Sequence, residues 1–222
     1  MRRAAAIVLA AGEGRRFGGA KLLAPLDGRP LLQHVLDIAA AAHLQPVIVV
    51  VGHDSPLLDA LIEWRSELRI TNPDPGLGLS SSLRLGMAAL FGAQPMPTAV
   101  LVFLGDQPRL EPAQVARILS APRDPRRPVV VPRYADGQPG NPVRIEPEGW
   151  SLVDEVEGDR GLAQLFERRP ELIRFVDVAG DNPDVDTPAD LAAVSRGAGP
   201  VRSDRMAAVG RNTPSAARRH RT

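Results

Sequence analysis

The chain has 222 residues, of which 44% are hydrophobic, and its 27 basic and 26 acidic residues leave a net charge of +1. This length and apolar content suit one sizeable domain with a buried core, plus a tail. The absence of cysteine excludes a disulfide framework, a thiolate metal site and a cysteine nucleophile. No apolar stretch is long enough to cross a membrane, and the N-terminus runs into a strand pattern without a secretion signal. We therefore expect a cytoplasmic protein with no membrane partner.

The charge is distributed unevenly along the chain. Residues 196–222 carry seven arginines and one acid, whereas residues 1–195 have a net charge of −5. Because the periodic apolar pattern also stops at Ser195, we expect residues 1–195 to form the folded domain and residues 196–222 a basic, disordered tail. Such a tail could touch nucleic acid, but no aromatic platform accompanies it, so a solvated tail is favoured.

The most informative stretch is an apolar run over residues 4–10, followed by a glycine-rich loop that ends at Lys21, the only lysine of the chain. The glycines let backbone N–H groups approach a ligand, and the cations Arg15, Arg16 and Lys21 can neutralise its charge. The loop is therefore predicted to bind an anion, most simply a chain of phosphates.

Two common phosphate loops do not fit this stretch. In the dinucleotide fingerprint a third glycine would follow Gly14 after two residues, but here Gly18 comes one residue too late. The Walker loop requires a hydroxyl residue after its lysine, and Lys21 is followed by Leu22.

The rest of the domain alternates between strand and helix patterns. Strands are predicted over residues 46–51, 68–71, 98–104, 129–132 and 172–178, and helices over residues 30–42, 55–65, 83–90, 112–119, 162–168 and 187–195. This alternation indicates an α/β fold: a three-layer α/β/α sandwich with a mostly parallel central sheet. The strand over residues 98–104 is apolar throughout and is expected to be central.

An acidic residue follows that strand directly. Asp106 would lie in the crevice at the carboxyl ends of the strands, where such sheets bind ligands. Because Mg²⁺ binds through one or two carboxylates plus substrate phosphates, Asp106 is the first candidate metal ligand, although a plain Asx turn also fits. Asp186 precedes a helix start at Thr187, whose capping box explains Asp190 but not Asp186. We expect Asp186 to complete the metal site.

Three further segments carry candidate residues. Ser80, Ser81 and Ser82 stand before a helix, where they either cap its N–H groups or face a ligand. Residues 134–145 suggest a β-hairpin with a glycine-rich tip, expected to reach over the crevice toward a second substrate, although an ordinary hairpin fits as well. Asp159 is expected to cap the helix that begins near Leu162.

Taken together, three motifs resemble those of the MobA-like NTP transferases. They are L-A-A-G-x-G-x-R-x-G-x-x-K from Leu9 to Lys21, the segment Gly105–Pro108, and D-x-D-T-P-x-D-L from Asp184 to Leu191. The resemblance spans residues 4–194 and implies the GT-A, Rossmann-like nucleotidyltransferase fold.

The resemblance also implies roles for individual residues. Arg15, Lys21 and Asp106 would be catalytic, and Asp106 and Asp186 would hold Mg²⁺, with Mn²⁺ as an alternative. The nucleotide would contact Leu9, Ala10, Ala11, Gly12, Gly14, Lys21, Gly78, Ser80, Ser81 and Ser82. The second substrate would contact Gly140, Asn141 and Asp159. The family often has Gly-His-Pro-Val where this chain has Gly140-Asn141-Pro142-Val143, so a histidine donor is replaced by an amide.

Within the family, Leu-Ala-Ala-Gly and the segment Gly76–Ser82 resemble the molybdopterin cytidylyltransferases more than the guanylyl enzymes. The expected reaction moves CMP from CTP to the terminal phosphate of a molybdopterin cofactor and releases pyrophosphate, with a molybdenum hydroxylase as recipient of the product. No general base is expected, because the attacking phosphate is already an anion. The alternatives are another phosphorylated acceptor such as a sugar 1-phosphate, use of GTP, or a non-catalytic cofactor chaperone.

Overall fold

A seven-stranded sheet forms the centre of the computed structural model, which describes residues 3–53 and 55–197. The strands run in the order β5 (Leu68–Thr71), β4 (Val47–Val51), β1 (Ala4–Ala10), β6 (Ala99–Leu104), β8 (Val143–Ile145), β7 (Val129–Arg133) and β9 (Ile173–Asp177). All neighbours are parallel except β8, which is antiparallel to both β6 and β7. The mostly parallel sheet and the central position of β6 are thus confirmed.

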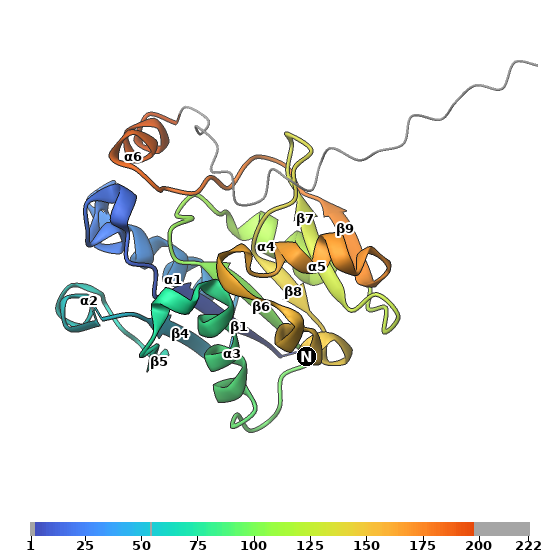
Figure 1. Cartoon of the computed structure of the whole chain (residues 1–222). Coiled ribbons are helices and arrows are strands. Elements are labelled where there is room, and N and C mark those ends of the chain that lie inside the picture. Colours follow the sequence, from blue (N-terminus) through green and yellow to red (C-terminus); the bar gives the residue numbers. More distant parts are fainter. Residues whose placement is uncertain (1–2, 54, 198–222) are drawn as a thin grey trace, which may run out of the picture.

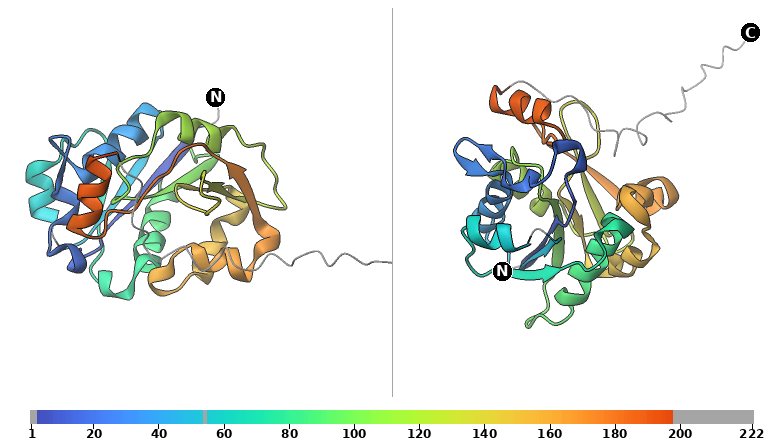
Figure 2. Two further views of the ribbon diagram at one scale, coloured as in Figure 1. Left: turned by 90° about the horizontal axis from the view of Figure 1, so that it is seen from above. Right: turned by 60° about the vertical axis from the view of Figure 1, so that its left-hand side comes forward.

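Helices cover both faces of the sheet (Figures 1 and 2). One face carries α1 (Leu31–Ala41), α2 (Ser55–Leu61) and α4 (Pro112–Ser120), and the other carries α3 (Leu79–Leu90), α5 (Ala163–Arg168) and the 3-10 helix η4 (Pro147–Glu155). The three-layer sandwich predicted from the sequence is confirmed. Residues 198–222, which include most of the predicted tail, lie outside the described residues.

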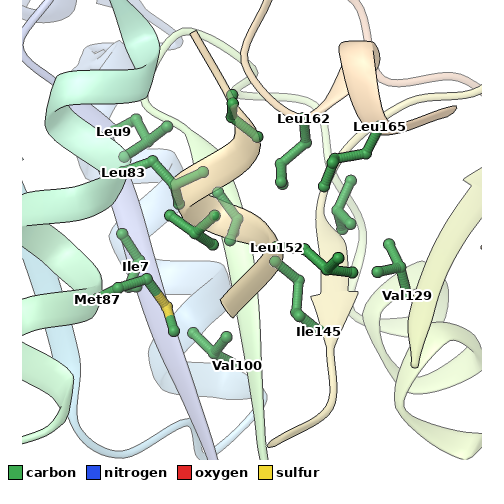
Figure 3. Close-up of a cluster of buried hydrophobic side chains, with 14 of the residues drawn as sticks. Ile7, Leu9, Leu83, Met87, Val100, Val129, Ile145, Leu152, Leu162 and Leu165 are labelled. Carbon is green, nitrogen blue, oxygen red and sulfur yellow. The ribbon is translucent and has the colours of Figure 1, made fainter. Parts of the chain in front are cut away.

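The β1 strand shows why its sequence is a continuous apolar run. Its residues alternate between the two faces: Ile7 and Leu9 pack under α3, whereas Ala6 and Val8 pack under α1. All seven positions are buried, because both faces are covered. Figure 3 shows the α3 side of this core, where Ile7, Leu9, Leu83 and Met87 meet.

Smaller elements connect this framework. A short antiparallel ladder of β2 (Pro25–Leu26) and β3 (Arg29–Pro30) precedes α1. Val194 of α6 (Pro188–Ser195) packs in one cluster with Leu26 of β2 and Leu31 of α1. The remaining 3-10 turns are η1 (Arg15–Phe17), η2 (Lys21–Leu23), η3 (Pro75–Leu77), η5 (Gly158–Arg160) and η6 (Pro170–Leu172). None of the helices in the described part of the chain has the length and apolar character needed to span a membrane.

Two element boundaries differ from the sequence expectation. The helix α2 ends at Leu61 rather than near Arg65, and α3 begins at Leu79 rather than Leu83. The early start of α3 puts the three serines inside its first turn. The predicted hairpin is present, because β7 and β8 pair antiparallel on either side of residues 134–142.

The core packing predicts the effect of a truncation in α3. Leu83 is 1% exposed within the cluster of Figure 3, so Leu83→Ala should lower the free energy of unfolding by about 2–5 kcal/mol through lost burial and a residual cavity. Urea unfolding followed by circular dichroism measures it. The matched control is Leu61→Ala, at a site 58% exposed, where a change within about 0.5 kcal/mol is expected. Equal losses at both sites would contradict this packing.

Candidate active site

The candidate site lies at the carboxyl ends of two neighbouring strands, β1 and β6, whose residues Leu9 and Leu104 are paired in register. The glycine-rich loop leaves β1 and folds back on itself, since the Gly14 carbonyl accepts hydrogen bonds from the N–H groups of Phe17, Gly18 and Gly19. Gly14 has a φ of 61°, in the left-handed region that glycine tolerates. The compact loop returns the chain to the strand ends at Lys21.

Lys21 joins two carboxylates from distant parts of the chain. Its Nζ atom lies 2.6 Å from Oδ2 of Asp106 and 3.0 Å from Oδ1 of Asp186. All three side chains are at least nine-tenths buried. The convergence of residues 21, 106 and 186 that the sequence motifs suggested is therefore present in the structure.

Asp186 is held in place by the helix that follows it. In α6, Thr187 and Asp190 form the predicted capping box, with the Thr187 N–H donating to Asp190 Oδ2 at 2.8 Å and the Asp190 N–H donating to Thr187 Oγ1 at 3.2 Å. The Asp186 N–H donates to the same Asp190 carboxylate at 3.2 Å. One residue earlier, the Val185 N–H donates to the Asp106 carbonyl at 3.0 Å, which ties the two acidic segments together.

The charges in this cluster are matched. Burial by itself lowers the pKa of the Lys21 ammonium, but the charge of Asp106 and the hydrogen bonds to Asp106 and Asp186 outweigh it, so the pKa is raised above its usual value. Lys21 therefore stays charged. A second cation, Arg16, places Nη2 2.8 Å from Asp186 Oδ2.

The carboxylates suit a divalent metal that keeps other ligands. Within the described residues, no group of three or more His, Cys, Asp and Glu side chains gathers at one place, so these residues form no all-protein metal cage. Oδ1 of Asp106 is nonetheless buried without a hydrogen-bond partner, which is expected for an oxygen atom that binds a cation. Two carboxylates with room for phosphate and water oxygens fit Mg²⁺ or Mn²⁺.

A cleft of about 270 Å³ opens in front of the cluster. It brings together nine of the candidates, namely Leu9, Ala10, Gly12, Gly14, Arg15, Lys21, Asp106, Asp159 and Asp186. Pro75, Gly76 and Leu79 also line it and were not among the candidates. Ala11 lines a neighbouring cavity of about 260 Å³.

The sequence left two roles open for the serines of α3, capping of the helix or contact with a ligand, and the capping role is wrong. The N-cap is Gly78, without a side-chain hydrogen bond, because the helix starts earlier than predicted. The Asn72 amide donates to Ser81 Oγ at 2.8 Å and to Ser82 Oγ at 3.0 Å, and Ser80 and Ser82 are buried. The three serines do not line the cleft, and the neighbouring Leu79 does.

Two arginines of the loop have different environments. The Arg15 side chain is 83% exposed and pairs with Glu13 at 2.5 Å, whereas Arg16 reaches Asp186. Both arginines were counted from the sequence among the cations of the loop, but a catalytic role was given to Arg15 alone. The arginine of the motif L-A-A-G-x-G-x-R is residue 16, which is a sequence signal for Arg16.

Of the three second-substrate candidates, Asp159 lines the cleft, whereas Gly140 and Asn141 do not. Asn141 is buried and lines a cavity of about 40 Å³ together with Asp159, while Gly140 lines neither this cavity nor the cleft. The Asn141 carbonyl accepts hydrogen bonds from the Tyr134 hydroxyl at 2.5 Å and from Asn182 at 3.0 Å.

One polar residue of this region, Asn182, escaped the sequence analysis. Asn182 also donates to Gln107, which in turn donates to Asp184 at 2.6 Å. Asn182 does not stand directly at the end of a strand or the start of a helix, so its position in the sequence gave no reason to select it.

Asp159 is not a helix cap, contrary to expectation. It belongs to the separate turn η5, and Leu162 is the N-cap of α5. The intervening Gly161 has a φ of 51°, which separates the two elements.

The close packing of Gly78, the N-cap of α3, against Gly158 and Asp159 can be tested by mutation. Gly78 has a φ of 90°, and a Cβ atom there would lie 2.4 Å from the Gly158 carbonyl carbon. Gly78→Ala should therefore destabilise the fold by about 1 kcal/mol or more and displace residues 158–160. Thermal unfolding measures the loss. Gly76→Ala is the control, since its Cβ would meet only Asp74 Oδ1 at 3.5 Å; equal unfolding temperatures for both variants would refute this account.

Known proteins resemble this chain in both sequence and structure. The model of the MobA-like NTP transferase domain matches residues 6–172. The crystal structure of the Rv0371c homologue from Mycobacterium sp. strain JC1 is 30% identical, with a TM-score of 0.78 over 88% of this chain and 96% of that chain. Rv0371c of Mycobacterium tuberculosis H37Rv, in complex with manganese, is 28% identical, with a TM-score of 0.74 over 87% and 98% of the two chains.

A match to a longer curated protein covers only part of it. The bifunctional protein GlmU of Burkholderia orbicola (strain MC0-3) is 35% identical over 122 residues, which is 54% of this chain and 26% of that protein. The chain thus matches about a quarter of the length of that relative. The family model, by contrast, covers most of this chain and includes both the loop and Asp106. The chain therefore belongs to the MobA-like NTP transferase family and contains its nucleotidyltransferase domain.

Proposed function

We propose that the protein transfers CMP from CTP to the terminal phosphate of a molybdopterin-type cofactor and releases pyrophosphate. The observation that carries this proposal is the buried contact of Lys21 with Asp106 and Asp186 beneath a glycine-rich loop. This set of one cation, two carboxylates and a glycine-rich loop along the cleft suits a triphosphate and its metal ion. The Leu-Ala-Ala-Gly form of the loop supports CTP as the donor.

The reaction requires charge neutralisation rather than proton transfer. An oxygen of the acceptor phosphate forms a bond to the α-phosphorus of CTP as the bond to the β-phosphate bridge breaks, and pyrophosphate leaves with that electron pair. The attacking oxygen is already anionic, so the site needs no general base. Lys21 and Arg16 would bind the phosphates, and the loop amides would orient them in line.

The two carboxylates complete this arrangement. Asp106 and Asp186 would hold Mg²⁺ or Mn²⁺, and manganese is the metal named in the complex of the M. tuberculosis protein. A bound divalent ion supplies neutralisation of the charge on the phosphate oxygens. The buried, unpartnered Oδ1 of Asp106 supports this assignment.

The acceptor would enter on the side of Asn141 and Asp159. The buried amide of Asn141 can donate a hydrogen bond to an acceptor oxygen but cannot act as an acid. The hydrogen bonds of Tyr134 and Asn182 to the Asn141 carbonyl hold this loop rigidly. We propose that a molybdenum hydroxylase in the cytoplasm receives the product.

The decisive experiment measures pyrophosphate release. The purified protein is mixed with Mg²⁺, each of the four NTPs in turn, and either molybdopterin or a sugar 1-phosphate. We expect release with CTP that depends on molybdopterin. Release that depends on GTP or on the sugar phosphate would redirect the assignment, and tight cofactor binding without any release would indicate a chaperone.

The carboxylate at the end of β6 should be essential for turnover. Asp106→Asn keeps the shape of the side chain and removes its charge, so we expect kcat to fall on the order of 100-fold or more, the size typical of losing one electrostatic group. Steady-state pyrophosphate assays measure this. Asp154→Asn makes the same change at an exposed position of η4 outside the cleft and should keep full activity. Full activity of Asp106→Asn would end its assignment as a metal ligand.

The two arginines of the loop should be separable by mutation. Arg16→Ala removes a contact with a buried carboxylate and should lower kcat/KM on the order of 100-fold. Arg15→Ala removes an exposed pair with Glu13 and should lower it only a few fold, as exposed ion pairs contribute little. The same pyrophosphate assay compares both variants. A larger loss in Arg15→Ala would restore Arg15 as the catalytic arginine.

A further inference from the structure

We propose that Lys21 is the resident counter-cation of Asp106 and Asp186, so that a divalent ion binds these carboxylates only together with a triphosphate that draws the ammonium away. Metal and nucleotide would then bind together. The enzyme without nucleotide would hold no divalent ion at these two carboxylates. This inference rests on the proposed function, because it concerns the same carboxylates.

The first argument is that Lys21 already occupies the ligand atoms a metal needs. Its ammonium contacts Oδ2 of Asp106 at 2.6 Å and Oδ1 of Asp186 at 3.0 Å. Arg16 contacts Oδ2 of Asp186 at 2.8 Å. A metal approaching the cluster would compete with two cations for these oxygens, and only Oδ1 of Asp106 lacks a hydrogen-bond partner.

The second argument is electrostatic. Lys21 and Arg16 match the charges of Asp106 and Asp186, so a divalent ion added alone would give these four groups an excess of positive charge. Buried charge without a partner is strongly disfavoured. A triphosphate brings both the missing negative charge and further oxygens for the metal.

The third argument is that Lys21 borders open space. It lines both the cleft of about 270 Å³ and the neighbouring cavity of about 260 Å³. Lysine carries its charge on a flexible four-carbon stem, so Nζ can leave the carboxylates for a phosphate without displacement of the backbone. The ion pair therefore joins a movable cation to two fixed carboxylates.

Mn²⁺ binding tests the proposal directly. Electron paramagnetic resonance measures the affinity for Mn²⁺ with and without α,β-methylene CTP, and with tripolyphosphate as a probe that does not depend on the base. We expect Mn²⁺ to bind the wild-type protein about 10- to 100-fold more tightly with either probe, a coupling in the usual range for linked sites. Equal affinity with and without both probes would overturn the proposal.

Substitution of the lysine should remove this coupling. Lys21→Met keeps the length of the side chain without its charge and should bind Mn²⁺ in the absence of nucleotide about tenfold more tightly than the wild type or more. Lys21→Arg, which keeps the charge, is the matched control and should bind Mn²⁺ alone as weakly as the wild type. If Lys21→Met binds Mn²⁺ no more tightly, the lysine does not compete with the metal.

A measurement on the unmodified protein keeps the test valid even if Lys21→Met fails to fold. Because Lys21 is the only lysine, protein made with ¹³C,¹⁵N-labelled lysine gives one set of lysine side-chain resonances in NMR spectra. We expect the ¹³Cε and ¹⁵Nζ signals to shift when Mg²⁺ and α,β-methylene CTP or tripolyphosphate are added together, and to stay unchanged with Mg²⁺ alone at the same concentration. Signals that move with Mg²⁺ alone, or with neither addition, would refute the proposal.

The outcomes separate this inference from the proposed function. Acceptor-dependent pyrophosphate release combined with tight binding of Mn²⁺ alone would refute only the role of Lys21. Coupled binding of Mn²⁺ and tripolyphosphate without turnover of any NTP would refute only the proposed transfer reaction.

Discussion

The buried contact of one lysine with two aspartates is the interaction on which the rest of this site depends. Residues 21, 106 and 186 come from three segments that share no local structure, and their charges hold them together in a place where each alone would be strongly destabilising. The backbone supports the contact, since the Val185 N–H donates to the Asp106 carbonyl and Asp190 fixes the start of α6. The cluster is therefore both a structural junction and a charged part of the cleft lining.

The sheet explains why this junction can bind phosphates. Parallel strands β1 and β6 end side by side, so the glycine-rich loop and Asp106 open onto the same edge. We propose that the glycine-rich loop, Lys21 and Arg16 bind the phosphates there. Neutralisation and alignment of anions is the chemistry that this proposal gives the site, and it agrees with membership of the MobA-like NTP transferase family.

The region around Asn141, where we propose that the acceptor binds, is built differently from the loop. Asn141, Asn182 and Gln107 form a chain of hydrogen bonds that links the β7–β8 loop to the segment before α6. These hydrogen bonds involve side chains and have definite directions. Discrimination between acceptors would then rest on this network, since a misplaced polar group in a buried site is costly.

The sequence by itself determined the layers of the fold, the positions of Asp106 and Asp186 at element ends, and the capping box of Thr187 and Asp190. These features depend on local signals, namely apolar runs, turn residues and cap spacing. Only the tertiary structure decided that Arg16 rather than Arg15 meets Asp186, that β8 runs antiparallel between β6 and β7, and that Asn72 engages Ser81 and Ser82. Side-chain direction and strand neighbours arise from contacts between segments far apart in the chain, and no local pattern encodes those contacts.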